Sequence, residues 1–138
     1  MEPASAAPAP GSGAPARRAL VLFAHGARAA SWADPFERLR DLTANRSPGV
    51  IVRLAFLELM SPQLPELVAE LAQQGVEELT VIPVFLGQGG HVLRDLPLLI
   101  DRLRIQFPSM SIGAVKAIGE DPSVLEAMAA YCASAGNR

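Results

Sequence analysis

A chain of 138 residues with a formal net charge of −2 is long enough for one domain with its own hydrophobic core. Its pI of about 5.6 reflects no excess of basic residues, so the composition does not favour binding to nucleic acid or anionic membranes. The single cysteine, Cys132, excludes an internal disulfide and any multi-cysteine zinc or iron–sulfur site within one chain.

Hydrophobic residues make up 50% of the sequence, and the mean hydropathy of +0.26 is high for a soluble chain of this length. We therefore expect an apolar core together with a surface that is buried against a partner subunit. No apolar run reaches the ~20 residues that span a bilayer. The apolar stretch at 19–24 ends in His-Gly rather than in a cleavage site, which argues against a signal peptide and favours a cytoplasmic protein.

Residues 1–18 are rich in Pro, Ala, Gly and Ser and, after Met1, contain no large apolar side chain. Such a segment has nothing to bury that would offset the entropy cost of ordering, so we expect a disordered leader. Residues 19–138 then form a single α/β domain.

The first half of this domain alternates strands and helices. Asp34, followed by Pro35 and Glu37, has the pattern of a helix cap with a capping box. Ser61-Pro62 repeats the signal of a cap followed by proline, and Gly75 is a suitable C′ residue. The expected elements are a strand at 19–24, a helix from 34 to about 45, a strand at 50–57 and a helix from about 62 to 74.

The second half continues the alternation. Pro83 lies inside an apolar run and lacks a ladder donor, so we expect a bulge or an early end to strand pairing there. Asp121-Pro122 starts the last helix. The expected elements are a strand at 79–86, a loop at 87–91, a helix that stops at Pro108, a strand at 111–115 and a terminal helix. The residues of that terminal helix expected to face the core are Val124, Leu125, Met128, Tyr131 and Cys132.

Alternating strands and helices with short connections predict a parallel sheet with helices on both faces, a three-layer α/β fold. We expect the strand order 2-1-3-4, which brings the carboxyl ends of the first three strands to one edge. Ligands of open parallel sheets bind at such an edge.

Three residues with functional side chains follow these strands. His25 ends the first, Glu58 the second and His91 the third, and the chain contains no other histidine. Two imidazoles and a carboxylate suit a divalent transition metal of borderline softness. They equally suit acid–base chemistry near pH 7. Each residue alone has a structural explanation, as a strand-end turn or a solvated charge, but the equivalent positions of both histidines favour a shared functional site.

The neighbouring residues favour a broad, acidic ligand. Gly89 and Gly90, with Gly87, serve backbone turns and leave space above the sheet edge. Arg28 and Arg94 flank the two histidines and could bind carboxylates, although both are also compatible with ordinary solvated arginines.

Three segments carry a family resemblance: LVLFAHGAR at 20–28, AFLELMSPQLPELVAEL at 55–71 and VIPVFLGQGGHVLRDLP at 81–97. They resemble the sirohydrochlorin chelatases of cobalamin and sirohaem synthesis, the CbiX/SirB type, and the likeness extends from about residue 19 to residue 131. The chain departs from the family at Ala27, where a serine is common.

The resemblance implies that cobalt(II), iron(II) or nickel(II) is inserted as a substrate into sirohydrochlorin, without ATP and without a permanently bound cofactor. His25 and His91 match the family's active-site histidines, and Glu58 matches its acidic partner, so these three are the implied metal ligands. Arg28, Gly89, Gly90 and Arg94 become candidate substrate-binding residues. Because larger members carry two such units in one chain, the short chain implies a homodimer.

Two other functions use the same residues. A non-catalytic carrier of metal or tetrapyrrole would need the same ligands, and the sequence does not separate it from a chelatase. A histidine-phosphatase-like hydrolase would need an arginine directly before the histidine, where this chain has Ala24. A purely structural partner domain would leave the paired histidines unexplained.

Overall fold

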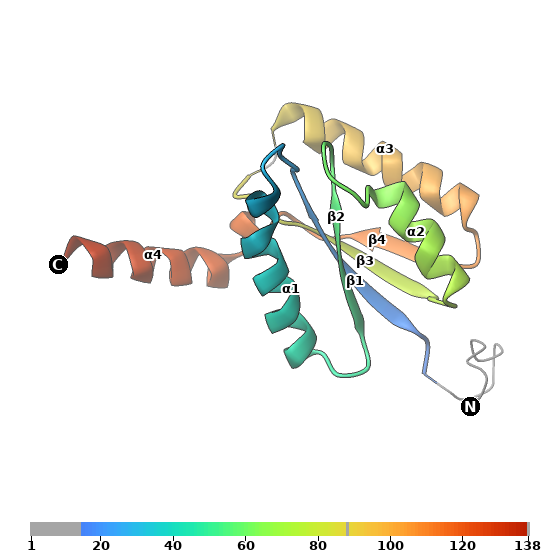
Figure 1. Ribbon diagram of the computed structural model, residues 1–138, viewed down its shortest axis with the longest axis horizontal. Coiled ribbons are helices and arrows are strands. Elements are labelled where there is room, and N and C mark those ends of the chain that lie inside the picture. Colours follow the sequence, from blue (N-terminus) through green and yellow to red (C-terminus); the bar gives the residue numbers. More distant parts are fainter. Residues whose placement is uncertain (1–14, 88, 138) are drawn as a thin grey trace.

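The computed structural model describes residues 15–87 and 89–137, and these form a four-stranded sheet with helices on its two faces (Figure 1). The strands are β1 (Arg18–Ala24), β2 (Ile51–Phe56), β3 (Glu78–Pro83) and β4 (Ser111–Ala114). The helices are α1 (Asp34–Arg46), α2 (Leu64–Gln73), α3 (Gly90–Gln106) and α4 (Pro122–Gly136). Two short 3-10 helices, η2 (Ala30–Ala33) and η3 (Ile118–Glu120), precede α1 and α4.

All pairings in the sheet are parallel and the strand order is β2-β1-β3-β4, which confirms the predicted topology. Phe23 of β1 lies opposite Ala55 of β2 and Pro83 of β3. The carboxyl ends of these three strands are therefore level, and the residues that follow them emerge at one edge.

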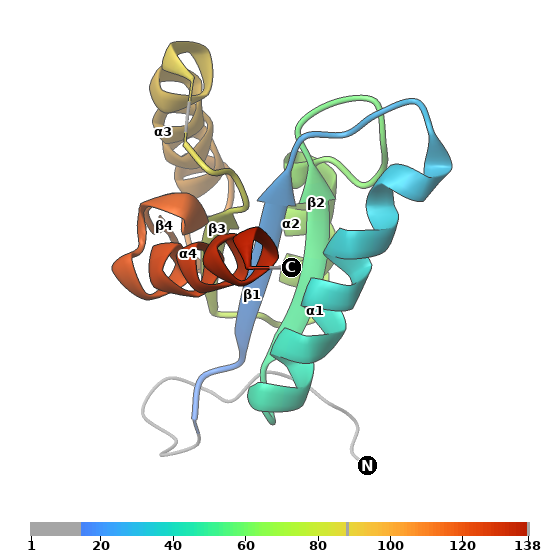
Figure 2. The same ribbon diagram turned by 90° about the vertical axis from the view of Figure 1, so that its left-hand side faces the viewer.

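Different helices pack on the two faces of the sheet. Helices α2 and α3 pack over one face on a core that includes Phe23, Val81, Leu67 and Ile100, all buried. Helix α1 packs on the other face through Phe36 and Leu39, over β1 and β2 (Figure 2). Leu42 of the same helix is 61% exposed.

The helix starts differ from two of the predicted caps. Asp34 is the first residue of α1 and makes no capping hydrogen bond, because the preceding turn η2 already leads into the helix. Gln63, rather than Ser61, caps α2, with Glu66 completing the capping box. Asp121 caps α4 as predicted, accepting from the backbone N–H groups of Ser123 and Val124. Gly75 has the positive φ (82°) expected of a residue that follows a helix.

The strand bounds also differ from those predicted. β3 ends at Pro83, as expected of a residue without a backbone N–H, and β2 is shorter than 50–57. β1 begins at Arg18, which is therefore part of the sheet rather than of a leader, and the Arg17 carbonyl accepts from the N–H groups of Glu77 and Glu78. The rest of the predicted leader falls largely on residues 1–14, which lie outside the described residues.

The largest difference concerns α4. We expected its apolar side to face the core, but the helix projects away from the sheet and contains no buried residue (Figures 1 and 2). Leu125 is 47% and Tyr131 72% exposed, and Cys132 is exposed as well. The apolar periodicity predicted a helix that buries one side; it did not determine what would cover that side. In the described part of the chain, no helix has the length and apolarity needed to cross a membrane.

Candidate active site at the carboxyl edge of the sheet

His25 and Glu58 meet at the edge where β1 and β2 end. The Nδ1 atom of His25 lies 3.1 Å from one carboxylate oxygen of Glu58. The other oxygen accepts a 2.7 Å hydrogen bond from the backbone N–H of Gly26. One carboxylate thus binds both the imidazole and the backbone of the His-Gly pair, which fixes the loop after β2 against the end of β1.

This close approach depends on glycine. A Cβ at Gly26 would overlap the backbone carbonyl oxygen of Glu58, so only glycine lets the two loops meet. The next residue, Leu59, has a φ of 70°, a left-handed conformation that costs a leucine of order 1 kcal/mol or more. Backbone strain of this kind is concentrated at functional sites, which agrees with the position of Glu58 beside it.

Three side chains hold His25: two contact its imidazole and one bonds its backbone. Glu58 engages Nδ1, the ring of Phe85 lies 4.9 Å away between centroids, and the indole N–H of Trp32 donates a 2.8 Å hydrogen bond to the His25 carbonyl. A carboxylate on Nδ1 favours the tautomer whose lone pair is on Nε2. With the side chain 49% exposed, Nε2 can bind a metal ion or accept a proton at the sheet edge.

The environment of Glu58 favours its charged form. Partial burial alone would raise the pKa of this carboxyl, but the Gly26 N–H and the neighbouring His25 outweigh it and hold the pKa below its ordinary value of 4.5. Glu58 is therefore ionised throughout the range in which histidine titrates, and it can stabilise a protonated imidazole.

This lowered pKa predicts a pH-dependent contribution to stability. Because the folded-state pKa lies below 4.5, the ionised carboxylate stabilises the fold above that pH, and the contribution disappears as pH falls through the lowered value. We expect Glu58→Gln to reduce the free energy of unfolding by about 1 kcal/mol at pH 7, given the partial exposure of the pair. Chemical denaturation at a series of pH values should show wild type and variant converging as pH falls below 4.5 and through the lowered pKa of Glu58. A constant difference across this range would contradict the assignment.

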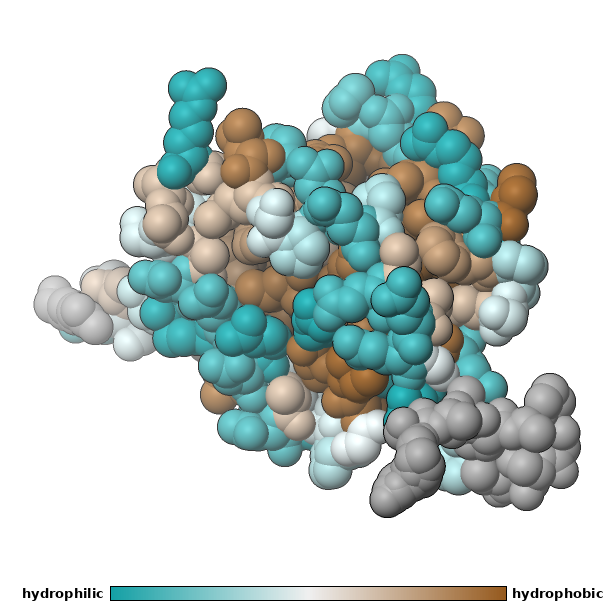
Figure 3. Space-filling view, turned by 45° about the vertical axis from the view of Figure 1, so that its right-hand side comes forward, coloured by the Kyte–Doolittle hydropathy of each residue, from teal (hydrophilic) through white to brown (hydrophobic). Residues whose placement is uncertain are grey.

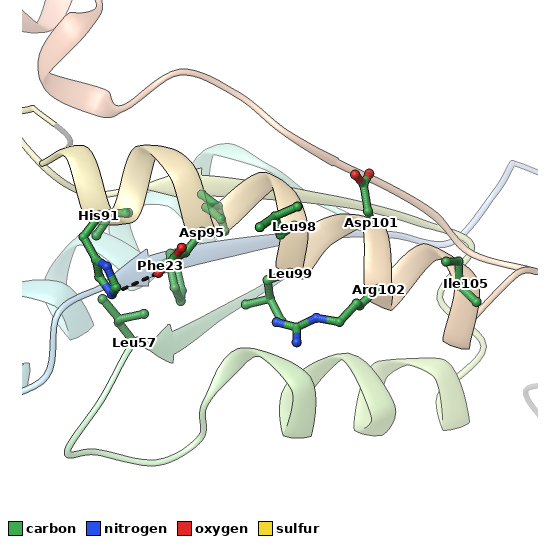
Figure 4. A pocket seen from close by; sticks show the side chains of 11 residues that line it. Phe23, Leu57, His91, Asp95, Leu98, Leu99, Asp101, Arg102 and Ile105 are labelled. Atoms are coloured by element: carbon green, nitrogen blue, oxygen red, sulfur yellow. Dashed lines mark ion pairs between the residues drawn. The ribbon is translucent and has the colours of Figure 1, made fainter.

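His91 occupies the first turn of α3 and points along that helix. Its Nε2 lies 2.9 Å from the carboxylate of Asp95, one turn later, and the side chain is 81% exposed. The pair borders an apolar groove of about 560 Å³ that runs along α3, lined among others by Leu99 and Arg102 of that helix and by Leu57, which follows β2 (Figure 4). Apolar surface is visible between hydrophilic side chains on this side of the molecule (Figure 3).

The structure brings together only part of the predicted site. His25 and Glu58 are in contact, whereas His91 pairs with Asp95, and within residues 15–87 and 89–137 no three His, Cys, Asp or Glu side chains form a metal-binding group. Arg28 and Arg94 are both exposed. Gly89 is the N-cap of α3 and Gly90 its first residue, so the predicted loop at 87–91 ends earlier than expected.

Sequence reasoning missed three neighbours of the histidines. Asp95 carried a signal, since it lies four residues after His91, but placing His91 in a loop concealed that helical spacing. Phe85 and Trp32 carried none, because each reaches His25 only through the turn of the chain that follows a strand.

The sequence matches the model of the CbiX family over residues 19–135, which is most of the chain. The chain belongs to the CbiX family. Among its relatives, the sirohydrochlorin cobaltochelatase of Methanocaldococcus jannaschii is 34% identical over 82 residues, 59% of this chain and 57% of that protein. The enzyme of the same name from Sulfurisphaera tokodaii is 26% identical over 78% of this chain and 84% of its own. The match thus spans little more than half the length of the Methanocaldococcus relative.

Two solved structures share this CbiX fold. A protein from Marinobacter aquaeolei VT8, described as a cobalamin (vitamin B12) biosynthesis CbiX protein, has a TM-score of 0.77 and 31% identity. The similarity covers 88% of this chain and 98% of that one. The sirohydrochlorin chelatase SirB from Bacillus subtilis subspecies spizizenii, in complex with cobalt, has a TM-score of 0.70 and 25% identity. This chain covers 47% of SirB and so corresponds to about half of it.

Proposed function

We propose that this protein is a chelatase that inserts cobalt(II) or iron(II) into sirohydrochlorin. The observation that carries the proposal is the His25–Glu58 pair, held at the carboxyl edge of the sheet with the imidazole Nε2 side open, in a chain that belongs to the CbiX family. The names of the cobaltochelatase relatives and of SirB support sirohydrochlorin as the tetrapyrrole.

The reaction requires that two pyrrole N–H protons leave as the metal ion enters the macrocycle. We assign His25 as one acceptor: its Nε2 takes the proton, and the ionised carboxylate of Glu58, 3.1 Å from Nδ1, stabilises the imidazolium that forms. Half-exposure of His25 lets the proton pass on to water. His91, in the first turn of α3, is the second proposed acceptor; because Asp95 engages its Nε2 at 2.9 Å, the nitrogen that takes the proton is Nδ1, and Asp95 stabilises the imidazolium that forms. Neither transfer uses ATP.

The same side chains are proposed to hold the metal substrate briefly. Imidazole nitrogens and a carboxylate suit cobalt(II), iron(II) and nickel(II). A site at an open edge, with few protein ligands, binds such an ion weakly enough to release it to the macrocycle. Arg28 and Arg94 are proposed to bind the carboxylates of sirohydrochlorin, and the backbone at Gly89 and Gly90 leaves room for its rim.

The proposal is tested by mixing the purified protein with sirohydrochlorin and cobalt(II) or iron(II) under anaerobic conditions and following the visible spectrum. We expect insertion to be faster than the spontaneous reaction and to continue for many turnovers per protein chain. A rate equal to the spontaneous one would contradict chelatase activity. Stoichiometric binding of metal or tetrapyrrole without turnover would instead support the carrier. Running the assay with each metal compares cobalt, iron and nickel directly.

We propose that this reaction takes place in the cytoplasm.

We further propose that the functional unit is a homodimer in which α4 packs on a second copy. The apolar side of α4, formed by Val124, Ala127, Met128, Tyr131 and Cys132, borders an open apolar surface. The same chain leaves part of the sheet face beside α1 uncovered, because α1 packs over β1 and β2. Ile82 of β3 and Val84, which follows that strand, are only half-buried there.

A second copy is the partner that these two surfaces favour. If α4 of each chain lies beside α1 on the sheet of the other, one two-fold axis covers both surfaces at once. The chain also corresponds to about half of SirB, so two copies together would match the length of one SirB chain.

A further inference from the structure

The short helix η3, which leads into α4, is attached to the segment that carries Phe85. The backbone N–H of Gly119 donates a 2.9 Å hydrogen bond to the Phe85 carbonyl oxygen. Gly119 is buried in this contact. The attachment joins residues 34 positions apart, at the point where the chain leaves β3 for the glycine-rich turn.

The contact is too close for any other residue. A Cβ at Gly119 would overlap the carbonyl oxygen and the Cα of Leu86. Both are backbone atoms, which cannot move aside as the end of a flexible side chain can. Any substitution at Gly119 must therefore shift the Phe85–Leu86 backbone or η3 itself. Gly113 in β4 provides the opposite case, because a Cβ there meets open space.

Phe85 connects the Gly119 contact to His25. Its side chain is 8% exposed and packs edge-on against Phe23, with 6.2 Å between ring centroids. The Phe85 ring also lies 4.9 Å from the imidazole of His25 between centroids, tilted at an interplanar angle of 49°. The imidazole is thus in contact with the carboxylate of Glu58 at Nδ1 and with the tilted ring of Phe85.

Helix η3 is fixed on the core by burial. Ala117, directly before it, is 0% exposed, and Gly119 within it is buried. Within the turn, the N–H of Glu120 donates to the Ala117 carbonyl at 2.9 Å and the N–H of Asp121 donates to the Ile118 carbonyl at 3.2 Å. Because its buried residues pack on the core, η3 supports the Phe85–Leu86 backbone.

We infer that Gly119 is a positioning residue for His25: by binding the Phe85–Leu86 backbone at contact distance, it holds the Phe85 ring against the imidazole and so sets the direction of Nε2. The positioning of His25 follows from these contacts, whereas its effect on the reaction rate rests on the proposed chelatase function. Gly119 itself touches neither metal nor macrocycle.

The experiment compares Gly119→Ala with Gly113→Ala, which adds the same methyl group where there is space. The imidazole nitrogen and carbon-bound proton resonances are recorded by NMR, and assignment is simple because the chain has only two histidines. We expect Gly119→Ala to shift the His25 resonances and to lower kcat for metal insertion about 10- to 100-fold with KM nearly unchanged, since small displacements of a reacting group have effects of this size. Gly113→Ala should leave both at wild-type values.

A second variant keeps the inference testable if Gly119→Ala does not fold. Phe85→Leu retains an apolar side chain but removes the aromatic ring, and the loss of its ring current shifts nearby protons by itself. The readouts for this variant are therefore the His25 imidazole nitrogen resonances, which we expect to shift, and kcat, which we expect to fall as in Gly119→Ala. Unchanged His25 resonances in folded Gly119→Ala, or unchanged His25 nitrogen resonances in Phe85→Leu, would overturn the inference. A shift of His25 in a protein whose wild type shows no metal insertion would uphold the positioning role while contradicting the chelatase proposal.

Discussion

His25→Ala is expected to reduce the rate of metal insertion into sirohydrochlorin by about 10²- to 10⁴-fold, the range associated with the loss of a general base. The variant removes the Nε2 acceptor and leaves Glu58 with only its hydrogen bond to Gly26. His91→Ala should also abolish most of the activity, since two protons must leave. Initial rates from the visible spectrum, at saturating metal, measure both effects.

Thermal unfolding and circular dichroism provide the control for these variants. Neither imidazole lies in the hydrophobic core, with 49% and 81% of the side chains exposed, so both variants should fold. Full activity in either folded variant would contradict the assignment of that histidine. If only His25→Ala loses activity, His91 takes part in no step of the reaction.

The second large effect is expected on assembly. In the proposed dimer, Tyr131 is buried by the partner, whereas in the single chain it is 72% exposed and contributes nothing to the core. Tyr131→Asp should therefore leave the monomer's fold intact but weaken association at least about 100-fold. The loss combines the buried area of the aromatic ring with the cost of placing a carboxylate in an apolar contact.

Ala133→Asp is the matched control, because it places the same charge on the opposite side of α4, where Ala133 is exposed. Sedimentation equilibrium at micromolar concentration should give twice 14.6 kDa for wild type and for Ala133→Asp, and values near 14.6 kDa for Tyr131→Asp. A wild-type mass near 14.6 kDa would contradict the dimer. Equal dissociation of both variants would show that charge, rather than the apolar side of α4, controls association.

Local patterns in the sequence determined the elements and their arrangement. Apolar runs with both faces covered, alternating with amphipathic helices, predicted the parallel sheet, and the expected strand order is the observed one. Pro83 predicted either a bulge or an early end of pairing, and β3 ends there. The edge at which His25 and Glu58 meet followed from that topology, because parallel strands deliver their carboxyl ends to the same side. The family resemblance of the same segments agreed with the match over residues 19–135.

Only the tertiary structure decided which groups are in contact. Phe85, Trp32 and Gly119 reach His25 or its supports across gaps in sequence that no period or motif encodes. The same limit explains α4. An apolar stripe predicts that one side of a helix is buried, because exposing apolar surface to water is unfavourable. The stripe has the same pattern whether that side packs on the sheet of its own chain or on a second chain. The three-dimensional path of the chain alone separates these cases.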